Sequence, residues 1–357
     1  MALAEEELAE LARRVGQAAA NAWPGATVDE LVALRGGVSS LTFASTIVFP
    51  GNRRIPIVVK VAPPGLAPVR NRDVLRQARI LRKLQCQPGI PTPGVLLEDD
   101  SAPPLFVMER LVGQSYEPKL DVSPDPPAPH VVAERARAAC RVLARIHSVD
   151  PFVVGEQHEP VLMASDELDR WAKLFDTVDP DICPTQAALR DDLAAGVPDP
   201  AGPALVHGDY RLANMIFDGP ELRGIIDWEI WSVGDPRGDL AWILMHTDPL
   251  HRFAEQRGPG DIAAGAGMPS LAVLLDEYTH ELAILDGDPA TATRGLEWWI
   301  ACSYYKTAAT LGVFIKRNRR LADPDRALQI ASDSLDDVIA RGAEVLAHYR
   351  RGATWRR

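Results

Sequence analysis

The sequence predicts an α+β protein with two lobes, a small β-rich N-terminal lobe and a larger, mostly helical C-terminal lobe. Its 357 residues are too many for one small core. Strand patterns with one embedded helix fill the first third of the chain, and helical patterns fill most of the rest. A stretch with five prolines separates the two. The predicted organisation is an N-terminal lobe at 1–112, a proline-rich linker or surface excursion at 113–130, and a C-terminal lobe at 131–357.

The N-terminal lobe begins with an apolar-periodic helix at 5–20. Between residues 31 and 61, LVALRGG, VSSLTFASTIVF and IPIVVKVA have the composition of strands, with PGNRR as a turn. Residues 73–85 are predicted to be helical because their apolar side chains fall on one side. GIPTPGVLLEDD and PLFVMERLVG supply two more strands. The result is a sheet with one helix embedded between its strands.

The C-terminal lobe begins with the strongly helical stretch VVAERARAACRVLARIHSVD. A strand-like pair around 204–232 is the exception in a region that is otherwise helical. No internal repeat is evident. A β-rich lobe joined to a helical lobe follows from this order of elements. The further predicted helices are 165–177, 185–195, 239–247, 270–285, 292–315 and 326–350.

Composition restricts the partners and the compartment. A net charge of −11 and a pI near 5.3 argue against binding to nucleic acid or to anionic lipid. The four cysteines are scattered, with no CxxC pair, which favours a reducing cytosol. The acidic start MALAEEELAELARRV is unlike a signal peptide, and no apolar run approaches the roughly 18 residues of a membrane span. We therefore expect a cytoplasmic protein without a membrane partner, either a monomer or a homodimer.

The stretch HGDYRLANMIFDG, followed by IIDWE, places polar groups around a predicted hairpin. If 216–217 and 224–226 form two short strands, Asn214 and Asp227 lie at the open end of that hairpin. A carboxylate and an amide oxygen suit Mg²⁺, whose remaining ligands are phosphates and water. Asp209 is then placed to orient a hydroxyl and receive its proton. This is the arrangement of a phosphoryl-transfer site.

HGDYRLAN and IIDWE strongly resemble the aminoglycoside phosphotransferase family, which is related to the protein kinases. The resemblance extends over nearly the whole chain and implies a bilobal, protein-kinase-like fold. It implies that Asp209 is the catalytic aspartate and that Asn214 and Asp227 hold the metal. His207 would brace the loop, and Arg211 would lie near the transferring phosphate, although a surface arginine is the simpler alternative.

Lys60 ends the apolar run IPIVVK and is one of only six lysines, against 32 arginines. An ammonium at the end of a buried strand needs an anionic partner, and the resemblance implies the phosphates of ATP. The family places a glutamate where this chain has Gln77, which accepts a hydrogen bond but forms no ion pair. Asp73, one turn earlier, is a possible substitute.

Asp239 is expected to cap the helix that begins there and to brace the catalytic loop.

Two further segments are candidates for nucleotide contacts. LRGGVSSLTF offers backbone N–H groups and hydroxyls to a phosphate, although an ordinary hairpin turn would have the same composition. LFVMERL resembles the hinge strand whose backbone contacts adenine. The complete predicted nucleotide-binding set is Lys60, Gln77, Gly36, Gly37, Ser39, Ser40, Met108, Glu109 and Leu111.

The acceptor is indicated by a narrower resemblance. SDELDRWAKLFD and EWWIACSYYKTAATLGVFIKRN resemble helices of the kinase-like domains fused to certain acyl-CoA dehydrogenases. This implies a small-molecule hydroxyl substrate, on a fatty-acyl thioester or a related metabolite. Lys306 occupies a position where that resemblance leads us to expect arginine. The aromatic residues that would either shape a pocket or simply pack in the core are Trp171, Trp298, Trp299, Tyr304 and Tyr305.

Two alternatives to a metabolite kinase remain open. The protein could inactivate an aminoglycoside or macrolide antibiotic, which its acidic net charge permits for a cationic acceptor. It could also be a pseudokinase that binds ATP without transferring phosphate, because Gln77 replaces the expected glutamate. A protein kinase is disfavoured since no APE-like segment is present.

Overall fold

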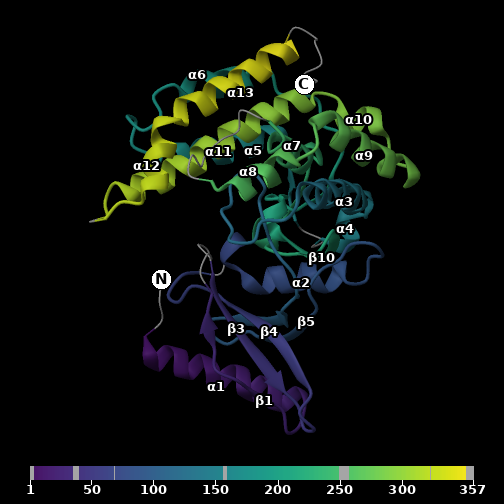
Figure 1. Ribbon diagram of the computed structural model, residues 1–357, viewed down its shortest axis with the longest axis vertical. Helices are drawn as coiled ribbons and strands as arrows, with labels where there is room; N and C mark the ends of the chain where they lie inside the picture. The colour runs from purple at the N-terminus through teal and green to yellow at the C-terminus, as the bar shows by residue number, and fades with distance from the viewer. Residues whose placement is uncertain are drawn as a thin grey trace. The chain divides into compact units, whose positions relative to one another are not determined.

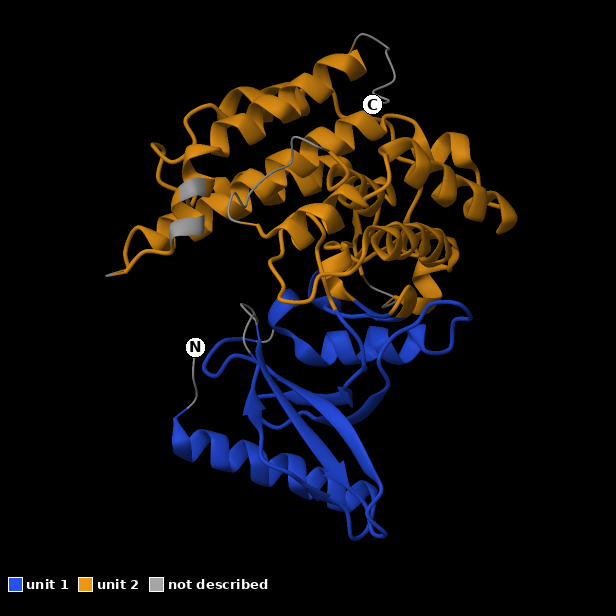
Figure 2. Ribbon diagram, in the orientation of Figure 1, with its two compact units in different colours: residues 1–114, 216–218, 223–230 blue, residues 115–215, 219–222, 231–357 orange. Residues whose placement is uncertain are grey.

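A computed structural model describes residues 4–34, 40–67, 69–155, 159–248, 257–321 and 323–350. The chain divides into two compact units, coloured separately in Figure 2 and labelled by element in Figure 1. The predicted domain boundaries at 112 and 130 stay predictions, because compactness alone does not define independently folding domains. Unit 1 consists of residues 1–114, 216–218 and 223–230; unit 2 consists of 115–215, 219–222 and 231–357.

Unit 1 is built on an antiparallel sheet with the strand order β1-β3-β4-β6-β5, in which β2 also pairs with β3. The predicted α+β class is confirmed, and the helix between strands is α2, which packs against β5 and β6. Helix α1 packs against β1 and β5. The elements are α1 (Glu5–Ala22), β1 (Thr27–Val28), β2 (Val32–Ala33), β3 (Leu41–Val48), β4 (Arg54–Val61), η1 (Arg70–Arg72), α2 (Val74–Leu84), β5 (Val95–Asp99) and β6 (Leu105–Glu109).

The alternation of side chains along β4 determines which face Lys60 occupies. Ile57, Val59 and Val61 are buried in the core cluster that includes residues of α1. Because successive side chains of a strand point to opposite faces, Lys60 points away from that cluster. Its cross-strand neighbours are Thr42 on β3 and Phe106 on β6. The sheet thus buries the stem of Lys60 and leaves its ammonium on the face opposite α1.

The predicted hairpin is present as a separate two-stranded sheet. It consists of β9 (Met215–Asp218) and β10 (Glu221–Ile225), joined by a tight turn that contains Gly219 with a φ of 54°. Asn214 directly precedes β9, and Asp227 follows β10 by two residues before the short helix η3 (Trp228–Ile230).

Unit 2 is mostly helical, as predicted. Its long helix α11 packs against α5, α6, α7, α12 and α13, while α3 packs against α8 and α9. In a small sheet, β11 pairs with β7 in parallel and with β8 in antiparallel orientation. The elements are α3 (Pro129–Ser148), α4 (Pro151–Val154), β7 (Val161–Leu162), α5 (Ala164–Phe175), α6 (Gln186–Ala194), β8 (Ala204–Val206), η2 (Leu212–Asn214), β11 (Ser232–Gly234), α7 (Arg237–Met245), α8 (Pro259–Ala266), α9 (Leu271–Ile284), α10 (Pro289–Thr293), α11 (Leu296–Asn318), α12 (Arg326–Asp333) and α13 (Leu335–Arg350).

Three helix predictions need correction. The helix predicted at 292–315 begins at Leu296, because Gly295 has a φ of 72° that separates it from α10. The single helix predicted at 326–350 is two helices, α12 and α13, divided at Ser334. Helix α7 begins two residues before the predicted start, so Asp239 lies in its first turn and Pro236 is its N-cap.

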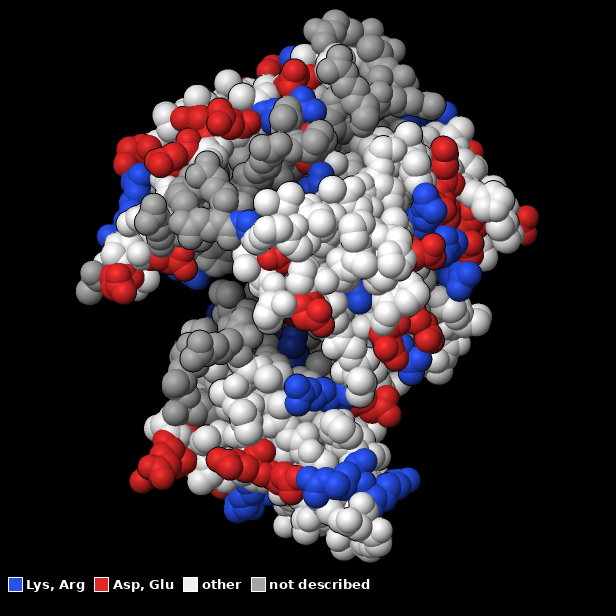
Figure 3. All heavy atoms as spheres, viewed as in Figure 1, with Lys and Arg blue, Asp and Glu red and all other residues white. Residues whose placement is uncertain are grey.

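The predicted surface excursion is partly buried. Tyr116 and Glu117 are 3% and 1% exposed, and α3 begins at Pro129, inside the predicted linker. On the face drawn in Figure 3, acidic and basic side chains are interspersed among uncharged residues in both units. None of the helices in the described ranges combines the length and the apolar character that crossing a membrane requires.

Candidate active site

The loop after β8 is anchored by a buried carboxylate beneath it. Asp239 is 1% exposed, and it accepts hydrogen bonds from the backbone N–H groups of His207 at 2.6 Å and Gly208 at 2.9 Å. Burial raises the pKa of Asp239, but the nearby His147 and His207 outweigh that effect and keep it below its usual range. The predicted brace is therefore confirmed. The predicted cap is wrong, because this carboxylate bonds the loop rather than the amides of its own helix.

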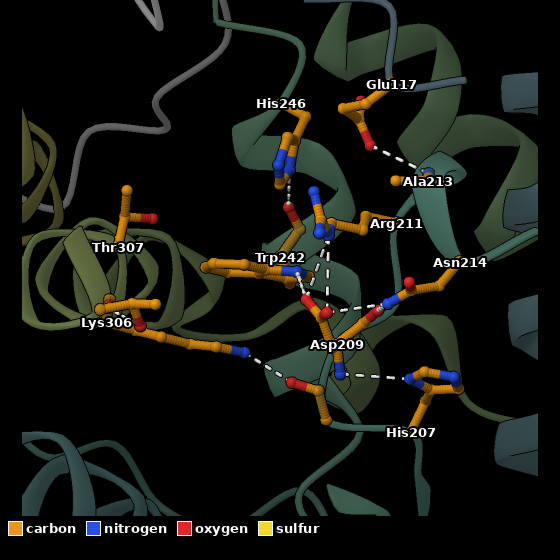
Figure 4. Close-up of polar contacts among 12 residues, drawn as sticks. Glu117, His207, Asp209, Arg211, Ala213, Asn214, Trp242, His246, Lys306 and Thr307 are labelled. Atoms are coloured by element: carbon orange, nitrogen blue, oxygen red, sulfur yellow. Dashed lines mark hydrogen bonds and ion pairs between the residues drawn. The ribbon is translucent and has the colours of Figure 1, made fainter. Parts of the chain in front are cut away.

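Asp209 is held by donors from several elements (Figure 4). Its Oδ1 accepts a hydrogen bond from Trp242 Nε1 at 2.8 Å, and its Oδ2 accepts one from Asn214 Nδ2 at 2.7 Å. The Nε of Arg211 lies 3.4 Å from Oδ1. The backbone N–H of Asp209 donates to His207 Nδ1 at 3.2 Å, so His207 serves the loop as a brace. These contacts fix the orientation of the carboxylate.

Electrostatics keep Asp209 ionised. Burial raises the pKa of this carboxyl, but the positive charges of Arg211 and Lys306 and the hydrogen bond from Asn214 lower it to about 2. A carboxylate with so low a pKa is a weak base at neutral pH. It is well suited to accept a hydrogen bond from a hydroxyl, and it binds a proton only after that hydroxyl oxygen has become strongly acidic.

In unit 1, the ammonium of Lys60 contacts two side chains. Its Nζ lies 2.7 Å from Asp227 Oδ1 and donates to Gln77 Oε1 at 3.2 Å. The amide nitrogen of Gln77 is buried, and no described residue forms a hydrogen bond with it. Asp73 does not substitute for the missing glutamate, because it caps α2 by accepting from Arg76 N at 3.1 Å and pairs with Arg79 at 3.3 Å. The proposed substitution by Asp73 is therefore wrong.

Asp227 has a left-handed backbone with a φ of 65°. Residues other than glycine seldom adopt this conformation, and such positions are concentrated at functional sites. As for Asn214, its side-chain N–H groups are used by the carbonyl and carboxylate of Asp209, which leaves its amide oxygen as the donor atom for a cation. Each of these side chains offers an oxygen ligand, the type of ligand that Mg²⁺ prefers. Within the described ranges there is no group of three or more His, Cys, Asp or Glu side chains that could hold a metal by itself.

The remaining predicted nucleotide contacts are only partly described. Gly36, Gly37 and Ser39 lie outside the described residues, and Ser40 is buried directly before β3. Met108 is buried within β6. Glu109 and Leu111 line a groove of about 250 Å³ in unit 1, together with Arg110, Asp218 and other residues.

The aromatic residues of α5 and α11 are core residues. Trp298 and Tyr305 are buried and satisfy their polar atoms within the protein, through Leu193 O at 2.9 Å and Gln186 Oε1 at 2.9 Å. Trp171 and Trp299 line a cavity of only about 40 Å³ in unit 2. That volume corresponds to about three water molecules.

Sequence reasoning missed two contributors to this site. Trp242, in the stretch GDPRGDLAWIL, donates a hydrogen bond to the carboxylate of Asp209, and Lys306 donates to the carbonyl oxygen of Gly208 at 2.5 Å. A tryptophan within an apolar helix such as α7 looks like a core residue in the sequence. The unusual lysine in the apolar helix α11 was a usable signal, because a buried ammonium requires a reason.

Comparisons with known proteins agree with this architecture. The family model of the phosphotransferase enzyme family matches residues 30–274. Acyl-CoA dehydrogenase family member 10 of Mus musculus is 28% identical over 278 residues, which cover 73% of this chain but only 24% of the mouse protein. The chain thus corresponds to about a quarter of that relative.

Two solved structures share the fold. A candidate aminoglycoside phosphotransferase of Ralstonia eutropha is 21% identical, with a TM-score of 0.70 over 96% of this chain and 98% of the other. A thermostable mutant of the aminoglycoside phosphotransferase APH(4)-Ia, in a ternary complex with AMP-PNP and hygromycin B, is 17% identical, with a TM-score of 0.54 over 89% of this chain and 95% of the other.

The fold and the matched model define the class of this protein as a phosphotransferase with a protein-kinase-like fold. The chain belongs to the phosphotransferase enzyme family, and it is similar in sequence to part of acyl-CoA dehydrogenase family member 10.

Proposed function

We propose that the protein transfers the γ-phosphate of Mg-ATP to a hydroxyl group of a small molecule. The observation that carries this proposal is the state of Asp209, an ionised carboxylate held by Trp242, Asn214 and Arg211 on a loop anchored from beneath. A carboxylate held in this way can orient a hydroxyl group while keeping its own position. The relatives that bind AMP-PNP or carry the phosphotransferase name support the choice of ATP as donor.

In the proposed mechanism, the acceptor hydroxyl donates a hydrogen bond to Asp209, which directs an oxygen lone pair towards the γ-phosphorus. The bond from that oxygen to phosphorus forms as the bond between phosphorus and the β–γ bridging oxygen breaks. Because the pKa of Asp209 is about 2, its carboxylate takes the hydroxyl proton late, when the oxygen already carries the phosphoryl group. ADP and the phosphorylated acceptor leave.

The other proposed roles concern the nucleotide. Lys60 would bind the phosphates of ATP, which requires its contact with Asp227 to be exchanged for the incoming ligand. Asn214 and Asp227 would hold Mg²⁺, which supplies neutralisation of the phosphate charge. Gln77 would help to hold the ammonium of Lys60. Met108, Glu109 and Leu111 would contact the base through their backbone, and Arg211 would lie near the transferred phosphoryl group.

For the acceptor, we favour a hydroxyacyl thioester or a related metabolite. The support is the similarity to acyl-CoA dehydrogenase family members, since a kinase-like segment joined to such an enzyme is expected to act on related acyl compounds. An aminoglycoside or macrolide is the second candidate, supported by the fold shared with an enzyme that binds hygromycin B.

The test is the release of ADP from Mg-ATP in the presence of hydroxyacyl-CoAs, aminoglycosides or macrolides, with Asp209→Asn as the control variant. Turnover of one acceptor class by the wild-type protein, lost in the variant, would support the proposal and identify the class. Binding of Mg-ATP with no ADP release across the panel would favour the pseudokinase alternative. Equal ADP release by both proteins would contradict the role of Asp209.

A further inference from the structure

Lys306 is a buried ammonium in an aromatic setting. It lies in the middle of α11 and is 9% exposed. Its Nζ lies 3.8 Å from the centre of the Trp242 ring and 5.1 Å from that of Trp171. No carboxylate in the described part of the chain forms a salt bridge with it, and its hydrogen bond goes to the carbonyl oxygen of Gly208 at 2.5 Å. Two indole faces and one carbonyl thus take the place of a carboxylate partner.

Such an arrangement is costly for a residue that only fills space. Burial disfavours the charged form and lowers the pKa of Lys306, while the negative charges of Asp209 and Glu167 oppose that effect. A methionine or leucine would fill a similar volume without desolvating a charge. The position therefore makes use of the ammonium itself, through attraction to the indole faces and to a carbonyl oxygen.

Two of the three groups around the Lys306 ammonium, Gly208 and Trp242, are connected directly to Asp209; Figure 4 shows Trp242 between Lys306 and Asp209. Gly208 directly precedes Asp209 and has a φ of 87°, so its carbonyl direction sets the entry of the chain into the aspartate. Trp242 presents its ring face to the ammonium, and its Nε1 donates to Asp209 Oδ1 at 2.8 Å. A displacement of Lys306 would therefore release both the main chain before Asp209 and the indole that holds one of its carboxylate oxygens.

We propose that Lys306 is a positioning residue for Asp209, acting through the carbonyl of Gly208 and the indole ring of Trp242. This inference rests on the proposed function, because it assigns a role relative to the proposed catalytic aspartate. The groups around its ammonium, Gly208, Trp242 and Trp171, all belong to unit 2, so we expect its loss to impair the chemical step rather than nucleotide binding. A purely structural role would affect stability without this separation.

The test compares Lys306→Met, which keeps the length of the side chain without its charge, with Lys306→Arg, which keeps the charge. Lys316→Met on the same helix is the matched control, because Lys316 pairs with Asp179 at 2.7 Å at the protein surface. The measured activity is the release of ADP from Mg-ATP. It is followed with the acceptor that the panel under the proposed function identifies or, if the panel identifies none, as slow hydrolysis of ATP. We expect Lys306→Met to lower kcat about 10- to 30-fold, with KM for Mg-ATP changed less than about 3-fold. Lys306→Arg should restore most of kcat, and Lys316→Met should resemble wild type.

A second readout is independent of turnover. The Nε1–H resonance of Trp242, assigned in a ¹H–¹⁵N spectrum by its loss in Trp242→Phe, reports the hydrogen bond to Asp209. Lys306→Met should shift this resonance, and Lys316→Met should leave it in place. If Lys306→Met does not fold, Trp242→Phe replaces it in the kinetic test, since it removes the indole N–H and should lower kcat by a similar factor with KM unchanged.

The outcomes separate the two proposals. If Asp209→Asn releases ADP at the wild-type rate, the proposed function fails whatever the Lys306 variants do. If Asp209→Asn is inactive while folded Lys306→Met has wild-type kcat and an unchanged Trp242 resonance, the positioning role alone is overturned. If the arginine variant is folded and as impaired as the methionine variant, the role of the charge is overturned as well.

Discussion

The two clusters proposed to act in phosphoryl transfer differ in how firmly their own unit holds them. In unit 2, Asp209 receives side-chain hydrogen bonds from Trp242 and Asn214, and the loop beneath it is bonded to the buried Asp239. In unit 1, Lys60 is held by Asp227 and by a longer contact to Gln77. The comparison teaches that the proposed acceptor-orienting group is preorganised, whereas the proposed phosphate-binding group has a partner that it must release.

The largest effect is expected at the preorganised cluster. Asp209→Asn keeps the shape of the side chain but removes the negative charge that orients the hydroxyl and takes its proton. We expect kcat to fall about 10²- to 10⁴-fold, with the affinity for Mg-ATP changed less than about 2-fold. Steady-state kinetics and calorimetric titration with Mg-ATP measure the two quantities. A variant that loses affinity as strongly as turnover would show that Asp209 belongs to the nucleotide site.

The second-largest effect should be a loss of affinity for Mg-ATP rather than a loss of kcat. Lys60→Met removes the ammonium proposed to bind the phosphates, and we expect the affinity for Mg-ATP to fall about 10- to 100-fold, as for the loss of a hydrogen bond to a charged group. The variant Asp227→Ala should weaken ATP binding in the presence of Mg²⁺, whereas metal-free ATP should bind at least as tightly as in wild type, because Lys60 loses the carboxylate that competes with the phosphates. If Lys60→Met binds Mg-ATP as tightly as wild type, Lys60 is not the phosphate-binding group, and the comparison between the two clusters fails.

A smaller effect is expected from Gln77→Glu. The new carboxylate lies within reach of Lys60, competes with Asp227 for the ammonium and adds negative charge near a proposed metal ligand. The change also removes the buried amide nitrogen, for which the described residues provide no hydrogen-bond partner. We expect KM for Mg-ATP to decrease about 2- to 10-fold, measured against Gln77→Met, which should not show the decrease. An increase in KM would mean that the release of Lys60 from Asp227 does not limit the binding of Mg-ATP.

The smallest effect concerns pH and stability. The pKa of Asp209 is lowered to about 2 in the folded protein, below the value of about 3.9 for an unfolded aspartate. The ionised carboxylate therefore contributes stability above about pH 4, and this contribution is lost as the pH falls towards 2. We expect wild type and Asp209→Asn to differ in Tm more at pH 6 than at pH 3. A difference that grows on acidification would contradict the assigned direction of the pKa shift.

The sequence was sufficient for the α+β class, for the hairpin around Asn214 and Asp227, and for the family. Each depends on local patterns, because periodicity and turn residues encode strands and helices, and the spacing in HGDYRLAN is a property of one loop. The division at Ser334 and the early start of α7 were not predictable in this way, because boundaries of helices depend on their neighbours.

By itself, the sequence determined which residue types lie on the loop and at the end of β4. Only the tertiary structure decided what surrounds them. Trp242 reaches Asp209 across 33 positions of sequence, and Lys306 reaches Gly208 across 98. Likewise, the partner of Lys60 is Asp227, 167 positions away, rather than Asp73. Contacts of this kind arise from the packing of elements that are distant in the chain, and local pattern contains no information about which buried cation will meet which carbonyl or ring.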